Sequence, residues 1–410
     1  MKFLYFGTVC DLIEYEEWLK NCKHKPTVAT INFEASFLKG LKENNADVDV
    51  YSFPMIPAFP KSRFFCWGNR KQDLDCGYQC TWLKTLNVPF AKQLIRELDG
   101  RRIIKNWLEE NKNEECLILT YSVPPFLGKN ILKYCKEYGA VSCAIVPDLP
   151  SNMYLNSKSN KFIKYIKEKY LEKTLEVQGC FDKYIYLTEA MSAEINPSKP
   201  FIVIEGIAST DTFKNLGNIK KNEAPAIMYA GRLHEKYGIV NLLDAFELVK
   251  NQEAELWIFG NGTAVGLIEQ RASENSRIRY FGSCSREKVL EFEKKAALLI
   301  NPRDPEEDFT GFSFPSKTIE YMLSGTPLLT TKLPGIPEEY YNYVFGIENN
   351  RPETIAAEID KIFEKEDEFL QKFGKAASEF ITTKKNARYQ TKRFLDFVGF
   401  SEEKNEDGLQ

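Results

Sequence analysis

The sequence predicts an α/β fold made of two doubly wound domains, each with a mainly parallel sheet. Short apolar runs recur along the chain, and segments of helical length separate most of them. These runs do not alternate between apolar and polar residues, which is typical of parallel strands that helices cover on both faces. A chain of 410 residues is also too long for one compact core, so two domains are expected.

The expected strands fall into two series along the chain. The first series comprises residues 3–7, 48–53, 116–122, 142–148, 183–189 and 201–206. The second series comprises residues 226–231, 255–260, 278–283, 297–302 and 326–331. Residues 239–252 have the pattern of a connecting helix, and the polar, aperiodic residues 209–225 indicate a linker. Two such domains leave a cleft, and sheets of this kind bind ligands at the carboxyl ends of their strands.

The composition argues against several classes of protein. The 55 Lys and Arg residues nearly balance the 58 Asp and Glu residues, and this balance does not favour a nucleic-acid binder. The 10 Cys form no CxxC pair, and 2 His are too few for a His-rich centre, so no metal site is predicted.

Neither a signal peptide nor a membrane span is predicted from the sequence. It begins MKFLYFG, turns acidic at once, and nowhere has eighteen consecutive apolar residues. We therefore expect a cytoplasmic protein whose contact with the cell membrane is at most peripheral, on the inner face. Residues 58–72 mix Lys and Arg with Phe and Trp, and residues 158–176 form a basic amphipathic stretch. Each segment suits either an anionic membrane surface or solvent.

Residues 312–327, FSFPSKTIEYMLSGTP, are predicted to contain a short helix. Pro315 suits its first turn, and Ser313 or Ser316 can accept hydrogen bonds from the free amides there. Gly325 fits the position just after the helix, where a left-handed backbone is common.

The same segment carries polar groups that a helix in the core does not need. The start of a helix favours anions, and Lys317 adds a full positive charge there. Ser316 and Glu320 are four residues apart and therefore share one face. An anion at the helix start and a hydroxyl-rich group near Glu320 correspond to a diphosphate and a ribose, hence to a sugar nucleotide.

A second motif, YAGRLHEKYG at residues 229–238, follows a predicted strand. A Gly at a strand end lets the backbone approach a ligand closely. Arg232 and Lys236 follow that Gly and are suited to bind a diphosphate and to stabilise the charge of a leaving group.

With these two motifs the chain resembles the family 4 glycosyltransferases of GT-B fold, in particular those of bacterial capsular polysaccharide and exopolysaccharide biosynthesis. The resemblance is clearest over residues 226–345 and looser before, where it depends on YFGT, VPDLP, YLTEAM and VIEG. It implies two facing Rossmann-like domains with an interdomain cleft. The acceptor-binding domain would cover residues 1–208, joined by a C-terminal helix at about 384–400, and the nucleotide-sugar domain residues 220–380.

The resemblance also implies site residues. Arg232 and Lys236 would bind the donor diphosphate, and Glu320 would hold the ribose hydroxyls. Ser316 and Lys317 fall where the family's motif lends backbone amides to the phosphate or the donor sugar. The remaining donor-binding positions are Gly7 and Thr8 in the first glycine-containing loop, Cys284 in the FGSC run where the nucleobase is read, and Phe314.

Three positions depart from the family pattern. Phe312 stands where the family has the first Glu of its paired-Glu motif, so Glu307 or Asp308 is the candidate replacement. Tyr237 occupies the place of the family's clamping Lys. The family's His in the N-terminal domain is also missing, and Asp148 in VPDLP is the polar group expected beside the reacting carbons.

The resulting expectation is a metal-independent, retaining enzyme that moves a hexose from a UDP-sugar to a lipid-linked saccharide, such as one on undecaprenyl. The UDP-sugar is a co-substrate, and no cofactor is expected. The alternative is a non-catalytic GT-B subunit that stabilises another glycosyltransferase, which the missing carboxylate at Phe312 favours. A nicotinamide dehydrogenase is disfavoured because no GxGxxG follows the first strand of either half.

Overall fold

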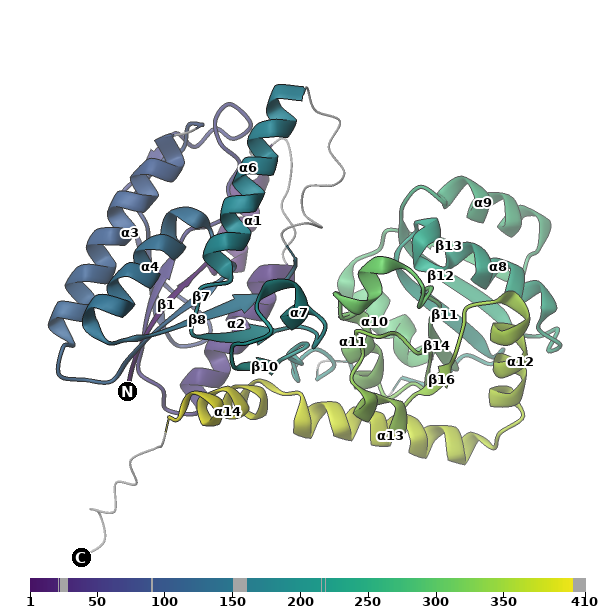
Figure 1. Cartoon of the computed structure of the whole chain (residues 1–410). Coiled ribbons are helices and arrows are strands. Elements are labelled where there is room, and N and C mark those ends of the chain that lie inside the picture. Colours follow the sequence, from purple (N-terminus) through teal and green to yellow (C-terminus); the bar gives the residue numbers. More distant parts are fainter. Residues whose placement is uncertain are drawn as a thin grey trace, which may run out of the picture. The chain divides into compact units, whose positions relative to one another are not determined.

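The computed structural model describes residues 1–20, 22, 29–89, 91–149, 161–214, 216–217 and 219–400. The chain forms two compact units (Figure 1). Unit 1 consists of Met1–Ile207 and Ala387–Gln410, and unit 2 consists of Ala208–Asn386.

Unit 1 is built on a sheet with the strand order β10-β9-β8-β7-β1-β2-β5-β4. Its neighbouring strands pair in parallel, except that β4 pairs antiparallel with β5 at one edge. A separate antiparallel pair, β3 with β6, lies in the same region of the chain as β4 and β5. The strands are β1 (Lys2–Gly7), β2 (Val48–Ser52), β3 (Cys66–Trp67), β4 (Lys71–Asp73), β5 (Gln79–Trp82), β6 (Thr85–Leu86), β7 (Cys116–Tyr121), β8 (Val141–Val146), β9 (Lys183–Tyr186) and β10 (Phe201–Val203).

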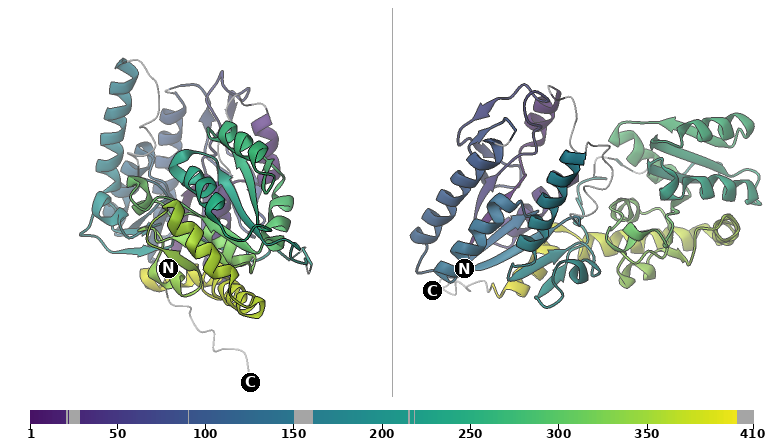
Figure 2. Two further views of the ribbon diagram at one scale, coloured as in Figure 1. Left: turned by 90° about the vertical axis from the view of Figure 1, so that its right-hand side faces the viewer. Right: turned by 45° about the horizontal axis from the view of Figure 1, so that its top comes forward.

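Helices cover both faces of this sheet. One core joins its central strands to α1, α2 and α14, while α3, α4 and α6 lie side by side on the other face (Figure 2). The C-terminal helix α14 packs closely on α2, because a Cβ on Gly40 would lie 2.2 Å from the carbonyl oxygen of Ala387. Asn44 Nδ2 also donates to the carbonyl oxygen of Arg388 at 2.9 Å. The helices are α1 (Leu12–Lys20), α2 (Ala29–Glu43), α3 (Ala91–Glu110), α4 (Pro125–Tyr138), α6 (Lys161–Gln178), α7 (Met191–Ile195) and α14 (Ala387–Val398).

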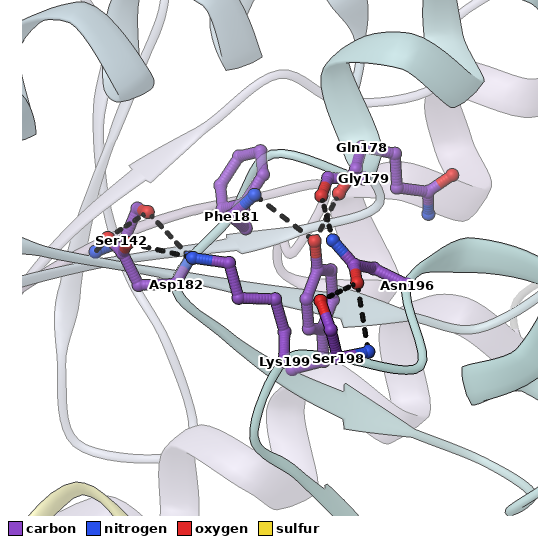
Figure 3. A network of polar contacts seen from close by, with 9 residues as sticks. Ser142, Gln178, Gly179, Phe181, Asp182, Asn196, Ser198 and Lys199 are labelled. Atoms are coloured by element: carbon purple, nitrogen blue, oxygen red, sulfur yellow. Dashed lines mark hydrogen bonds and ion pairs between the residues drawn. The ribbon is translucent and has the colours of Figure 1, made fainter.

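A polar network fastens the amino ends of β8, β9 and β10 (Figure 3). Asp182 accepts hydrogen bonds from the backbone nitrogen of Ser142 at 3.1 Å and from its hydroxyl at 2.7 Å. Lys199 Nζ lies 3.7 Å from the other oxygen of Asp182. Asn196 Nδ2 donates to the carbonyl oxygen of Gly179 at 2.7 Å. The network lies at the edge opposite the carboxyl ends of the strands, so it has a structural role.

Unit 2 contains a parallel sheet with the order β13-β12-β11-β14-β15-β16. Counted along the chain this order is 3-2-1-4-5-6, which is the Rossmann arrangement, and its direction reverses between β11 and β14. The strands are β11 (Ala226–Arg232), β12 (Glu255–Asn261), β13 (Ile278–Gly282), β14 (Leu298–Asn301), β15 (Leu328–Thr331) and β16 (Phe345–Ile347).

The unit 2 sheet separates two cores. One core includes α8, α9 and α12, and the other includes α11 and α13. The helices are α8 (Ile239–Leu248), α9 (Val265–Glu274), α10 (Arg286–Lys295), α11 (Lys317–Leu323), α12 (Pro352–Phe363) and α13 (Asp367–Lys384), with 3-10 helices η1 (Glu235–Tyr237), η2 (Asp308–Gly311) and η3 (Glu338–Asn342).

The predicted strands all occur, with ends that shift by one to three residues. The predicted start of the helix in residues 312–327 was wrong by two residues. Pro315 precedes α11, and Ser316 has helical backbone angles and makes no capping hydrogen bond with its side chain. Gly325, with φ of 77°, has the left-handed backbone expected after the helix. Within the described ranges no helix is both long and apolar enough to cross a membrane.

Candidate functional site

Two loops pack together at the carboxyl edge of the unit 2 sheet. They follow the neighbouring strands β11 and β14, between which the strand order reverses. Gly238 in the first loop has φ of 78°, and a Cβ there would lie 1.8 Å from the carbonyl oxygen of Pro302 in the second loop. The approach therefore requires glycine. Ligands of such sheets bind at this reversal point, so these loops are the first candidate for a site.

Arg232 and Lys236, both predicted to bind the donor, lie in the first of these loops. Arg232 is exposed at the end of β11, and its carbonyl oxygen accepts a hydrogen bond from the Tyr229 hydroxyl at 3.0 Å. Lys236 lies in η1, with its Nζ 5.3 Å from the ring centre of Tyr237 and 5.3 Å from that of Phe309. Neither cation has an ion-pair partner within the described part of the chain, so both remain free to bind an anion.

The second loop contributes Arg303, which the sequence reasoning missed. Its guanidinium carbon lies 5.0 Å from the ring centre of Tyr237. Burial lowers the pKa of Arg303 below its ordinary value, and the positive charge of Arg232 lowers it further. Arg303 comes directly after the INP end of β14, so comparing the charged residues after each strand would have found it.

A second group of charged side chains lies on α10 and α11. Lys317 Nζ forms an ion pair with Glu320 and lies 3.3 Å from Oε1 of the fully buried Glu293. Arg286 lies 3.7 Å from the other oxygen of Glu320. Two of the predicted donor-binding residues, Lys317 and Glu320, are thus in direct contact, and Glu293 joins them from a neighbouring helix.

The ionisation of this group follows from its burial. Burial raises the pKa of Glu293 well above its ordinary value, and the charge of Glu320 adds to the effect. Burial also opposes ionisation of Glu320, but Lys317, Glu293 and Arg286 together outweigh it and lower the pKa of Glu320. Glu293 therefore holds a proton under conditions in which Glu320 is charged.

Tyr321 connects α11 to the end of β11. Its hydroxyl accepts a hydrogen bond from the backbone nitrogen of Ala230 at 2.7 Å and donates one to the carbonyl oxygen of Ala230 at 3.1 Å. Tyr321 follows Glu320, and Ala230 lies two residues before Arg232. The hydrogen bonds of Tyr321 therefore connect the helix that carries Glu320 to the strand that ends at Arg232.

The other predicted donor-binding residues of unit 2 have different surroundings. Ser316 is exposed. Phe314 is 7% exposed and packs on Tyr340 in the core, so its side chain faces the interior. Cys284 is a half-buried free thiol whose Sγ lies 3.4 Å from the carbonyl oxygen of Phe281. The roles of these residues in binding a donor stay predictions.

Phe312, at the position of the missing carboxylate, ends the 3-10 helix η2. The two candidate replacements differ in exposure, since Glu307 is half-buried and Asp308 is exposed. In the described part of the chain neither carboxylate forms an ion pair, so each is available to a ligand.

In unit 1, the predicted residues Gly7 and Thr8 surround a buried carboxylate that the sequence reasoning missed. Glu34 accepts hydrogen bonds from the backbone nitrogen and the hydroxyl of Thr8 and from the hydroxyl of Tyr5, the last at 2.7 Å. A Cβ on Gly7 would lie 1.8 Å from Oε2 of Glu34. Both donors of Thr8 are thus used within unit 1. Asp148 lies after β8 with an exposed side chain, although the surrounding atoms desolvate its carboxyl enough to raise its pKa.

Residues 211–380 match the model of a family described as "Glycosyl transferases group 1". A curated relative, the probable glycosyltransferase WbjE of Pseudomonas aeruginosa, is 30% identical over 172 residues. These residues make up 40% of this chain and 39% of the relative, so the match spans about two fifths of the relative's length.

Solved structures match nearly the whole chain. Sucrose-phosphate synthase from Thermosynechococcus elongatus is 14% identical with a TM-score of 0.62, covering 97% of this chain and 98% of that chain. HepE from Anabaena, solved in complex with UDP, is 11% identical with a TM-score of 0.59, covering 97% of this chain and 99% of that chain. A lipopolysaccharide outer core galactosyltransferase, WaaB, is 12% identical with a TM-score of 0.59, covering 97% and 99%. These similarities confirm the predicted GT-B fold, with two Rossmann-like domains and parallel sheets.

Proposed function

We propose that the protein is a glycosyltransferase that moves a hexose from a UDP-sugar to a lipid-linked saccharide in bacterial surface polysaccharide assembly. The proposal depends mainly on the match of residues 211–380 to the glycosyl transferases group 1. This range covers most of unit 2, which contains the candidate site. Unit 2 also has the Rossmann strand order, and the cations at its reversal point form no ion pair with any described residue. The name of WbjE and the UDP bound to HepE support the same class of reaction and donor.

In this proposal Arg232 and Lys236 bind the donor diphosphate. The diphosphate gains negative charge as the glycosidic bond breaks, and cations that strengthen their interaction at that point lower the barrier. Glu320, ionised beside Lys317, accepts hydrogen bonds from the ribose hydroxyls. Backbone groups near Cys284 contact the uracil.

The reaction is proposed to retain the anomeric configuration and to need no metal. The departing phosphate accepts the proton of the acceptor hydroxyl on the same face of the sugar, so no catalytic pair of carboxylates is required. Gly7 and Thr8 are proposed as donor contacts, and Asp148 as the polar group beside the reacting carbons. A lipid-linked acceptor would place the protein on the inner face of the cell membrane as a peripheral protein.

The test is a thermal-shift screen against nucleotide sugars, followed by calorimetry with UDP and turnover measured with and without EDTA. We expect a UDP-sugar to raise the unfolding temperature more than UDP alone, with activity unchanged by EDTA. Product configuration determined by NMR would test retention. The alternative function, a non-catalytic subunit, is favoured by Phe312. If no UDP-sugar binds and Glu320→Ala changes nothing, the alternative replaces the enzyme.

A further inference from the structure

Arg303 is a half-buried arginine whose guanidinium group makes no hydrogen bond and no ion pair within the described part of the chain. Its guanidinium carbon lies 5.0 Å from the ring centre of Tyr237. The backbone of Arg303 is well fixed, because its carbonyl oxygen accepts a hydrogen bond from the Thr331 hydroxyl at 2.6 Å. The backbone of Arg303 is therefore fixed, and its guanidinium group lies against the ring of Tyr237.

Such an arrangement leaves the donors of a half-buried guanidinium group to water or to a ligand. A guanidinium group has five N–H donors and keeps its charge, and removal from water is unfavourable unless those donors are satisfied. Stacking on an aromatic ring recovers only part of that loss. The folded chain thus carries a cation whose donors are suited to a ligand with several oxygen atoms.

The position of Arg303 indicates which ligand this is. It follows β14, and Arg232 ends β11, so the two arginines stand on either side of the point where the strand order reverses. β11 and β14 pair in parallel at Met228 and Leu299, and each arginine lies four residues beyond its strand's member of that pair. Two cations at corresponding positions after neighbouring strands, neither with an ion-pair partner in the described part of the chain, suit a ligand with at least two negative charges.

Tyr237 contacts a second cation of the site as well as Arg303. The ring of Tyr237 contacts both Arg303, at 5.0 Å, and Lys236, at 5.3 Å. This tyrosine stands where the resembling family has its clamping Lys. We propose that Arg303 binds the diphosphate of the nucleotide-sugar donor together with Arg232, and that Tyr237 orients Arg303 in place of the missing lysine. The inference rests on the proposed function, because it names a further residue of the same donor site.

The experiment measures binding of UDP, UMP and uridine by calorimetry to the full chain and to Arg303→Met. Methionine keeps the contact with Tyr237 and removes the charge. We expect affinity for UDP to fall at least about tenfold, affinity for UMP to fall less, and affinity for uridine to change by less than about twofold. Arg303→Lys should give an intermediate loss, because lysine keeps the charge without the planar pair of donors.

Arg277→Met is the matched control. Arg277 is also half-buried and stacked, 4.9 Å from the ring of Phe246, but it precedes β13 at the opposite edge of the sheet. We expect its affinity for UDP to equal that of the unchanged protein. Unfolding temperatures without ligand provide a second readout. Arg303→Met should unfold at the same or a higher temperature, because it removes a charge that the apo protein leaves unpaired.

Two results separate the inference from the function on which it rests. If the unchanged protein binds UDP and Arg303→Met binds it equally well, the inference is wrong and the proposed function stands. The inference is also wrong if Arg303→Met lowers the unfolding temperature and leaves the affinity for UDP unchanged. If the unchanged protein binds neither UDP nor inorganic pyrophosphate, both the function and the inference are wrong.

Discussion

The ammonium group of Lys317 lies 3.3 Å from Oε1 of Glu293, a carboxyl with no exposed surface. The same ammonium group pairs with Glu320, so two carboxyls share one cation, and a proton on one of them removes the repulsion between two negative charges. The pKa of Glu293 is raised by burial and that of Glu320 is lowered, so the proton belongs on Glu293. Glu320 is thereby kept in the ionised form that accepts hydrogen bonds from hydroxyl groups.

We predict that Lys317→Met destabilises unit 2, because it leaves two neighbouring carboxyls without their shared cation. The free energy of unfolding should fall by about 1–3 kcal/mol, measured by denaturant unfolding. Lys361→Met is the control, since Lys361 is exposed on α12 and its ion pair with Glu358 is expected to contribute less than about 0.5 kcal/mol. Equal losses in the two variants would contradict the shared-cation arrangement.

We predict that Glu320→Gln weakens binding of UDP about tenfold or more, because a charged acceptor is lost to the ribose hydroxyls. Calorimetry with 2′,3′-dideoxy-UDP, which lacks the ribose hydroxyls, should show weak binding to the unchanged protein and nearly the same affinity for Glu320→Gln. Glu291→Gln, a half-buried carboxylate on α10 paired with Lys295, serves as the control. A parallel loss for UDP and its dideoxy form would mean that Glu320 acts elsewhere than on the ribose.

The strand positions were predictable because each central strand is an apolar run that both faces of the sheet bury. The strands that were missed are short. β4 and β16 have 3 residues each and β3 and β6 have 2 each, so they lack the length that gives a pattern. β5 has 4 residues, and its sequence QCTW is not an apolar run. The polar residues of α11 were noticed because they interrupt an apolar helix, and the contact between Lys317 and Glu320 follows from their spacing.

The missed site residues depend on contacts between distant parts of the chain. Glu293 lies 24 residues before Lys317, and only the packing of α10 beside α11 brings them together. Its burial was not predictable, because Glu293 stands in REKVLEFEKK, a segment that reads as a solvated helix. Arg303 was missed for the same reason, because its contact with the ring of Tyr237 joins two different loops. Such pairs carry no periodic signal in a single sequence.

We predict that Gly238→Ala disrupts the candidate site. The new Cβ would need a positive φ of 78° and would lie 1.8 Å from the carbonyl oxygen of Pro302, so the two loops must separate. We expect a loss of about 2–4 kcal/mol in the free energy of unfolding and weaker UDP binding, measured by denaturant unfolding and calorimetry.

Gly266→Ala is the control for this change. Gly266 lies in α9, where a Cβ would meet nothing within 4 Å, so alanine should stabilise the protein by about 0.4–1 kcal/mol. If Gly238→Ala retained both its stability and its affinity for UDP, the two loops would not be as closely packed as described.

The last prediction concerns the pH dependence of unit 1. Burial raises the pKa of Glu34 from its ordinary value of 4.5 to about 7, although hydrogen bonds from Thr8 and Tyr5 act in the opposite direction. As the pH rises from about 4.5 to about 7, the unfolded chain loses this proton while the folded chain retains it. The folded state then binds more protons than the unfolded state, so the free energy of unfolding falls with rising pH.

Glu34→Gln isolates this contribution, because glutamine does not titrate. The free energy of unfolding of the unchanged protein, minus that of Glu34→Gln, should fall by about 3 kcal/mol between pH 4.5 and 7 and stay level above that range. Tryptophan fluorescence in a Trp257→Phe background would follow unit 1 alone, because Trp257 lies in unit 2 and the other four of the 5 Trp lie in unit 1. A difference that stays constant from pH 4 to 8 would show that Glu34 ionises at its ordinary pKa, and that Thr8 and Tyr5 stabilise its charge enough to cancel the effect of burial.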